Sequence, residues 1–505
     1  MVKLKKAATT HLTCLILLAL TLAAQSGCGK NTAETSVPAQ NTEESGYEQR
    51  RTALMEGSKD DSLNDKEKIA DEKLNKMKAQ LLRWYGGYTN FPYDIPTMND
   101  SGLTNSELYT FCKKMPKGGD LRSNGCDGLS MDALLLLLSE REDFHVCLED
   151  GFCYGYMYDA DIGPFPEGSI MLKEGMQNGR LSDSRLTDMW TLRTLTEFND
   201  PLEKLNKVRI QTDCINNDEK LVSKIYEETF LSYITNNVSF VELRIPFKSD
   251  SVANEKTVKL IRGAYYKVKK ENPDFTVKII AVADKSKETE KDDIKASIED
   301  AMRLREQIKD ESDKNDPKYF IIGYDLCGSD YESRPLADLE KLLNDDRIKQ
   351  SGLKPFLTAG DSLSAENTDV ADAYLLDAKR VGHALNLNRF PELMEKYSAG
   401  KICIETCPIS NCRMGYTADL RLHPATLYMQ DGGPIVLCSD IARYTEHEVL
   451  TDDYFAAVMC WDLGLADLKR LAENSIKYSG LPDEEKETLS ENWKKDWDKF
   501  IEEWQ

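Results

Sequence analysis

Histidine is scarce in this sequence, which has only His11, His145, His383, His423 and His447 among its 505 residues. Imidazole is the commonest metal ligand and the usual general base near neutral pH, so few histidine-based centres can be built here. No two histidines have the His-x-His or His-Glu-x-x-His spacing of zinc sites. The chain also lacks a Gly-x-Ser-x-Gly elbow, a phosphate-cradling glycine-rich loop and a Gly-x-Gly-x-x-Gly motif, which excludes the enzyme classes that depend on them.

Basic residues are in the minority: 65 Lys and Arg stand against 87 Asp and Glu, for a formal net charge of −22. Such a charge repels a phosphate backbone, so we exclude nucleic acid as a partner. Hydrophobic residues make up 41% of the chain, enough to form a core over most of its length. The length allows one large domain or up to about three smaller ones.

Thirteen cysteines are present, and eleven remain once Cys14 and Cys28 of the N-terminal leader are set aside. An odd number excludes a complete disulfide framework. Two arrangements stay open: an isolated bridge such as Cys147 to Cys153, or buried free thiols throughout.

Residues 1–28 predict an export signal. A basic start precedes an apolar run from Leu12 to Ala24 that is too short to span a bilayer comfortably. The segment ends in Gln25-Ser-Gly-Cys28, which resembles a bacterial lipobox, although an ordinary signal peptide cut nearby also fits. We expect a protein that is lipid-anchored at Cys28, at the outer face of a bacterial cell membrane or in the periplasm. Residues 29–64 then form a flexible polar tether.

Hydrophobic periodicity predicts an α/β fold of the (β/α)8 TIM-barrel type over residues 91–480. An amphipathic helix occupies 65–90, with apolar residues at helical spacing. Eight β-rich runs then alternate with helical patterns, at 120–124, 238–244, 277–284, 319–325, 354–360, 380–384, 401–406 and 434–439. In such a barrel the active site lies at the carboxyl ends of the strands. The long gap after the first run predicts an insertion at about 140–200, and 481–505 is expected to be a C-terminal helix.

Seven motifs stand at or near these strand ends, in this order: Met115-Pro-Lys-Gly-Gly-Asp-Leu121, Val241-Glu-Leu-Arg244, Gly323-Tyr-Asp-Leu-Cys-Gly328, Arg380-Val-Gly-His383, Glu405-Thr-Cys-Pro-Ile-Ser-Asn411, Asp419-Leu-Arg-Leu-His-Pro424 and Cys438-Ser-Asp440. Together they resemble the adenosine deaminase family of metal-dependent hydrolases, and within it the secreted growth factor branch, over about residues 65–480. The resemblance implies a zinc hydrolase that converts adenosine to inosine and ammonia.

The zinc site implied by the resemblance is not reproduced. Family members hold zinc through a His-x-His pair on the first strand, a His on the fifth and an Asp on the eighth. Here Arg122 and Asn124 stand at the pair, Thr358 replaces the third histidine, and only Asp440 keeps its ligand type. Arginine does not lose its proton in proteins and cannot ligate a metal. We expect Arg122 to pair with Asp440, and no zinc cofactor unless the site is rebuilt in another way.

Three further residues match, fully or in part, catalytic or binding positions of the family. His383 matches the histidine that orients the attacking hydroxide, Asp361 stands where the family has a proton-shuttling Glu, and Gly328 matches a backbone donor to the purine. Structural roles are also open, as a hydrogen-bonded pocket residue for His383 and as a tight turn at Gly328.

Two functions therefore remain open. The first is a pseudoenzyme that binds a purine nucleoside or a partner. The second is an active adenosine deaminase, or a related hydrolase with an atypical metal site, that works through His383, Asp361 and Asp440. The loss of three imidazoles favours the first, because little else generates hydroxide at neutral pH. In the growth factor branch the N-terminal helices dimerise, so the resemblance also implies a possible homodimer; packing on its own barrel is the alternative for this helix.

Overall fold

The computed structural model describes residues 46–47, 49–51, 62–87, 89–93, 102–149, 152–157, 164–192, 201–310, 318–328, 333–361 and 363–505. The chain divides into two units, 1–61 and 62–505, and the second carries the fold described below. Cys28 and most of the predicted tether lie outside the described residues. Within the described part, no helix combines the length and the apolar character needed to cross a bilayer.

Eight parallel strands form a single sheet whose spatial order follows the chain: β1 (Gly118–Asn124), β5 (Val238–Pro246), β6 (Thr276–Asp284), β9 (Ile321–Cys327), β10 (Lys354–Ala359), β11 (Arg380–His383), β12 (Cys403–Thr406) and β13 (Ile435–Leu437). The first and last strands meet where the amide of Asp440 donates to the carbonyl of Arg122 at 2.9 Å. A bridge between Ser123 and Asp440 accompanies this bond. The predicted (β/α)8 barrel is confirmed.

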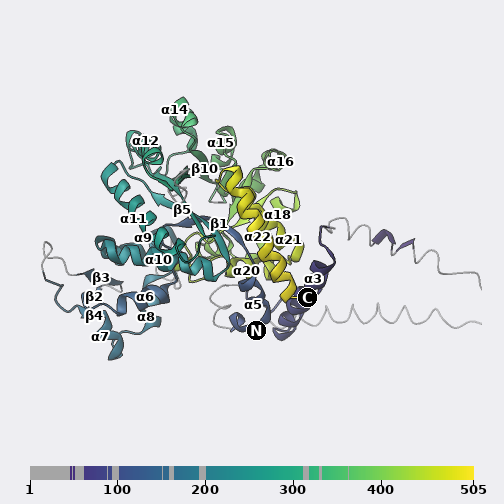
Figure 1. Ribbon diagram of the computed structural model, residues 1–505, viewed down its shortest axis with the longest axis horizontal. Coiled ribbons are helices and arrows are strands. Elements are labelled where there is room, and N and C mark those ends of the chain that lie inside the picture. Colours follow the sequence, from purple (N-terminus) through teal and green to yellow (C-terminus); the bar gives the residue numbers. More distant parts are fainter. Residues whose placement is uncertain are drawn as a thin grey trace, which may run out of the picture. The chain divides into compact units, whose positions relative to one another are not determined.

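Helices cover the outside of the barrel (Figure 1). The main covering helices are α10 (Glu219–Thr235), α11 (Ser251–Lys269), α12 (Lys291–Gln307), α13 (Glu340–Leu343), α14 (Asp346–Gln350), α15 (Asp369–Leu375), α16 (Pro391–Ala399), α17 (Pro408–Arg413), α18 (Ala425–Gln430), α19 (Ala442–Thr445), α20 (Thr451–Cys460) and α21 (Leu465–Lys477). Strand-to-helix turns use capping side chains: Asp250 accepts from the amides of Val252 and Ala253 at the start of α11. A short ribbon of β7 (Lys309–Asp310) and β8 (Lys318–Tyr319) precedes β9.

The expected N-terminal helix is α3 (Asp65–Trp84), which begins with a capping box between Asn64 and Glu67. Its buried face includes Ala70, Leu74 and Met77. This face packs on α21, on α22 (Asp483–Glu503) and on α5 (Glu107–Lys114). The apolar stripe of α3 is therefore covered by its own domain.

The insertion after β1 packs around a second hydrophobic cluster. It contains α6 (Met131–Ser139), β2 (Phe144–Glu149), β3 (Phe152–Met157), β4 (Ile170–Met171), α7 (Leu172–Gln177), α8 (Asp183–Trp190) and α9 (Pro201–Gln211). Figure 1 shows β2–β4 and α6–α8 grouped to one side of the barrel. The second hydrophobic cluster includes Phe144 and Trp190 of the insertion, Ile225 of α10, and Ile441 and Tyr444, which follow β13. The cluster thus extends beyond the predicted 140–200 and joins the insertion to the barrel.

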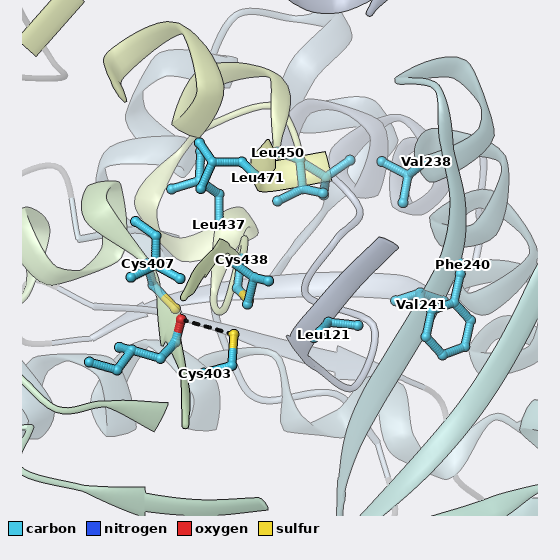
Figure 2. Packing of buried hydrophobic residues seen from close by; sticks show 14 of the residues in the cluster. Leu121, Val238, Phe240, Val241, Cys403, Cys407, Leu437, Cys438, Leu450 and Leu471 are labelled. Atoms are coloured by element: carbon cyan, nitrogen blue, oxygen red, sulfur yellow. Dashed lines mark hydrogen bonds between the residues drawn. The ribbon is translucent and has the colours of Figure 1, made fainter. Parts of the chain in front are cut away.

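Cys147 and Cys153 do not form a bridge. In the antiparallel pair of β2 and β3, Cys147 lies opposite Tyr154 and Cys153 lies opposite Leu148. Successive side chains alternate between the faces of a strand, so the two thiols are on opposite faces of the ribbon. All eleven cysteines of the described part are free thiols. Figure 2 shows Cys403, Cys407 and Cys438 beside Leu437 in the main hydrophobic core, where thiols act as small apolar side chains.

Candidate functional site

A cavity of about 830 Å³ opens at the carboxyl ends of the barrel strands. Its lining includes every described residue that the sequence singled out for the site: Arg122, Asn124, Gly328, Thr358, Asp361, His383 and Asp440. These residues are scattered over more than three hundred positions of the chain, and the barrel brings them to one end because parallel strands all finish there.

Arg122 lies at the floor of this cavity among three carboxylates. Its Nη1 atom is 3.3 Å from Oε2 of Glu405 and 3.4 Å from Oδ2 of Asp325. Its Nε atom is 3.5 Å from Oδ1 of Asp440. The side chain is only 3% exposed. The predicted pair of Arg122 and Asp440 is therefore present, and two further acids that were not predicted share the same guanidinium.

Two more arginines extend this charged layer into the barrel. Arg244 donates from Nη2 to both carboxylate oxygens of Glu405 at 2.7 Å and from Nε to Asp325 at 3.0 Å. Arg380 bonds Glu405 and Glu242. Burial alone would raise the pKa of Glu405, but Arg244, Arg380 and Arg122 lower it to about 2. Each buried charge therefore has an opposite charge in contact, as burial in a barrel interior requires.

The four positions of the family's zinc ligands do not fit zinc. The Asn124 amide donates to Oδ1 of Asp440 at 2.7 Å, which occupies the one carboxylate that remains. Thr358 donates from its hydroxyl to Asp325 at 2.9 Å. Arg122 contributes a permanent cation where a metal needs a lone pair. In the described residues, no group of three or more His, Cys, Asp and Glu side chains has a metal-binding arrangement.

His383 lies at the end of β11 and lines the cavity. Its Nδ1 atom is 3.0 Å from Oδ1 of Asn411, and the Nδ2 atom of Asn411 is 2.9 Å from Nε2 of His423. Burial, together with the charge of Arg122, lowers the pKa of His383 to about 4, and burial lowers that of His423 to about 3. Both imidazoles are neutral at physiological pH.

The backbone at the cavity is held in an uncommon conformation. His383 has φ of 63° and Asp440 has φ of 53°, both in the left-handed region. For residues other than glycine this conformation costs on the order of 1–3 kcal/mol and persists where surrounding contacts enforce it. The surrounding contacts therefore enforce the backbone conformation from which these two side chains project.

Gly328 follows β9 directly, and a Cβ atom at this position would overlap the hydroxyl of Ser333. A larger residue would therefore displace the Ser333 hydroxyl, and the tight spacing supports the turn interpretation. Gly328 also lines the cavity together with Asp361. The structure therefore brings both residues to the place where the resemblance implied ligand contact.

Sequence reasoning gave no role to six buried polar residues that build the site: Arg244, Asp325, Arg380, Glu405, Asn411 and His423. Each lies within a motif that carried the family resemblance. The sequence did contain a signal: the charged residues Glu242 and Arg244 lie within the apolar strand Val238–Pro246. In the structure they are only 0% and 1% exposed. Charged residues inside a strand that is buried on both faces indicate an internal ion-pair layer.

A family model described as adenosine deaminase matches residues 176–496. Adenosine deaminase 2-A of Danio rerio is 28% identical over 475 residues, with 88% of this chain and 90% of that protein covered. Human adenosine deaminase 2 is 27% identical, with 87% and 89% covered. Among solved structures, the N6-methyl-AMP deaminase of Arabidopsis thaliana has a TM-score of 0.56 at 17% identity and covers 77% of this chain and 98% of its own. The last comparison shows a shared fold.

Proposed function

Because this chain belongs to the adenosine deaminase family, we propose that it is a pseudoenzyme of that family, which binds a purine nucleoside without hydrolysing it. Family hydrolysis depends on a zinc ion that lowers the pKa of bound water toward neutrality.

The observation that carries the proposal is the environment of Arg122. Its guanidinium contacts Asp325, Glu405 and Asp440 at 3.3 to 3.5 Å. These three carboxylates are therefore already paired with a fixed positive charge. A divalent cation would have to be held beside this guanidinium, and the two charges would repel strongly in a buried site. Asn124 and Thr358 supply an amide and a hydroxyl, which are weak zinc ligands.

The cavity at the carboxyl ends of the strands supports the binding of a nucleoside. Its volume of about 830 Å³ is within the range of small-molecule sites. It still presents His383, Asp361 and Gly328 at family-equivalent positions. His383 lines this cavity and its lowered pKa keeps it neutral, so we assign it a binding role.

The test is metal content and turnover on the purified soluble form that starts after Cys28. Elemental analysis should find no stoichiometric zinc, and added zinc should produce no adenosine-to-inosine absorbance change. A matched Asp440→Ala variant serves as the control, since its metal content should equal that of the wild type. Stoichiometric zinc with turnover that Asp440→Ala abolishes would establish the alternative, an active deaminase with an atypical metal site.

We also propose that the protein is exported and lipid-anchored at Cys28. The support is the basic start, the short apolar run and the lipobox-like Gln25-Ser-Gly-Cys28. Lipid labelling and membrane fractionation of the full chain should place the wild type in the membrane fraction, and Cys28→Ser in the soluble fraction. A soluble, unlipidated wild type would contradict the anchor.

A further inference from the structure

His447 and Asp453 form a buried ion pair between the loop after α19 and helix α20. Nε2 of His447 lies 3.2 Å from Oδ2 of Asp453, and both side chains are 0% exposed. The other carboxylate oxygen of Asp453, Oδ1, accepts from the backbone amide of Ile409 in α17 at 3.4 Å. The pair thus connects this loop and α20 to α17, the helix that also carries the cavity residue Asn411.

The ring contacts of His447 favour a protonated imidazole. Nδ1 lies 2.8 Å from the hydroxyl oxygen of Thr445, and that hydroxyl can donate to the carbonyl of Ile441 at 3.1 Å. With both ring nitrogens protonated, His447 turns one N–H toward Asp453 and donates the other to Thr445, which keeps its bond to Ile441. A neutral ring protonated at Nε2 would take the Thr445 hydrogen instead and break that bond. The charged ring therefore satisfies one more hydrogen bond.

Carboxylates from two elements face this imidazole. Burial alone would lower the pKa of His447, but Asp453, with Asp452 of α20 and Asp120 of β1, raises it above the ordinary value of 6.5. The hydroxyl of Tyr109 in α5 donates to Asp452 at 2.6 Å. The negative charge of this cluster thus compensates the cost of burying a charged histidine.

Backbone strain is concentrated on both sides of His447. Glu446 has φ of 52° and Leu450 has φ of 55°, in the left-handed region that residues other than glycine seldom adopt. A backbone bond of 2.6 Å also closes a three-residue turn around Leu450. Such conformations persist only where the surrounding contacts enforce them. The ion pair of His447 lies inside this strained segment, 446–450, and is one of those contacts.

We propose that protonated His447 and Asp453 form a clamp on the strained segment 446–450, and that the segment is released when His447 loses its proton. After that loss, Asp453 is a buried carboxylate without its counter-charge and keeps the long bond from the amide of Ile409. Removing one partner of a buried pair is strongly destabilising, because the remaining charge is uncompensated.

The direction of the pH dependence follows from the raised pKa of His447. A histidine whose pKa is raised by folding contributes stability that is complete below the unfolded value of 6.5. This stability is lost as the pH rises through the pKa of the folded protein. The clamp is therefore closed in mild acid and opens on the alkaline side.

The clamp lies beside the cavity wall. Asp440 and Ile441 line the cavity and lead through α19 into the segment 446–450. The carbonyl of Tyr444 in α19 also accepts from the amide of Leu192 in the insertion at 2.7 Å. Release of the segment would therefore loosen the side of the cavity where the barrel meets the insertion. This inference does not rest on the proposed function, since it holds whatever the cavity binds.

The first experiment is an NMR pH titration of the histidine side chains in the protein that starts after Cys28. This chain contains four histidines, and His447→Gln assigns the signals of His447 by difference. We expect His447 to titrate above pH 6.5, with both ring nitrogens protonated at pH 6. A His447 ring that is neutral at pH 6 would overturn the proposal.

Asp453→Asn tests the cause of the raised pKa. The variant has nearly the same shape and can still accept from the amide of Ile409, but it carries no charge, so the pKa of His447 should fall. Asp498→Asn, at an exposed position of α22, is the matched control and should leave it unchanged. A pKa of His447 that is the same in Asp453→Asn and in the wild type would overturn the clamp. If Asp453→Asn does not fold, the wild-type titration still decides whether His447 is charged.

Hydrogen exchange of a peptide that covers 442–453 tests the release. After correction for the intrinsic exchange rate, we expect protection to be at least about fivefold lower in wild type with neutral His447 than at pH 6. His447→Gln carries no charge, so its protection should be low at both pH values, whereas His145→Gln in the insertion should behave like the wild type. Equal corrected protection in the wild type above and below the pKa of His447 would overturn the release.

Discussion

Arg122 and Asp440 join the first and last strands of the barrel twice. The amide of Asp440 donates to the carbonyl of Arg122 at 2.9 Å, and the Arg122 Nε atom lies 3.5 Å from Oδ1 of Asp440. The residues that replace and retain metal ligands thus also close the sheet. The positive charge beside Asp440 is covalently part of strand β1.

Replacing Arg122 should therefore destabilise the fold. In Arg122→Met the stem remains, but Asp440 loses its buried counter-charge, and breaking a buried pair costs roughly 3–5 kcal/mol. Arg122→Lys keeps the charge and loses the planar fork, so its loss of unfolding free energy should be less than half as large. Urea unfolding of the three proteins measures this. A Met variant within about 0.5 kcal/mol of wild type, the range typical of exposed positions, would show that the pairing adds no stability.

Glu405 should make stability depend on acid. Its pKa is lowered from 4.5 to about 2 by Arg244, Arg380 and Arg122, against the effect of burial. A lowered carboxyl pKa contributes stability above pH 4.5, and this contribution is lost as the pH falls from 4.5 toward 2.

Comparison with Glu405→Gln isolates this contribution. The variant should be roughly 3–5 kcal/mol less stable than wild type at neutral pH, because three buried arginines lose a shared negatively charged partner. The difference should shrink as the pH falls below 4.5. Urea unfolding of both proteins across this range gives the two curves, and a difference that is constant with pH would contradict the assignment.

The thiols should all be reactive after unfolding. Alkylation in denaturant without reductant should modify eleven cysteines in the chain that starts after Cys28, since all eleven are free in the structure. Cys147→Ser should change the melting temperature little, whereas loss of a disulfide typically costs 2–5 kcal/mol. Nine modified thiols, with Cys147 and Cys153 protected, would mean that the ribbon of β2 and β3 rearranges.

Trp84 can be used to test the homodimer that the resemblance to the growth factor branch implies. It is 84% exposed at the end of α3, next to Leu81 and Tyr85, which line a surface cavity of about 270 Å³. An exposed Trp beside apolar groups is typical of an interface anchor. If the dimer forms there, Trp84→Ala should shift the population toward monomer in light scattering. Ile69→Ala, a second exposed apolar position on α3 (51% exposed), is the matched control and should leave the dimer intact.

The sequence by itself determined the fold and the residue types at the positions where the family resemblance implies metal ligands. Strand runs and their order predict the barrel, because buried parallel strands read as short apolar segments separated by helical patterns. Arg122 excludes a ligand at its position whatever the structure, because a guanidinium has no lone pair to offer a metal. The pairing of Arg122 with Asp440 also followed, since both belong to strand ends that meet at one place.

Only the tertiary structure decided how the charges and protons are shared. Glu405 meets Arg122, Arg244 and Arg380 because four separate strands direct side chains into one interior, and no local pattern encodes that convergence. Asn411 likewise joins two residues that are forty positions apart, since its Oδ1 atom contacts His383 and its Nδ2 atom contacts His423. Hydrogen-bond partners in a barrel come from different strands and loops, so their geometry exists only once the sheet has closed.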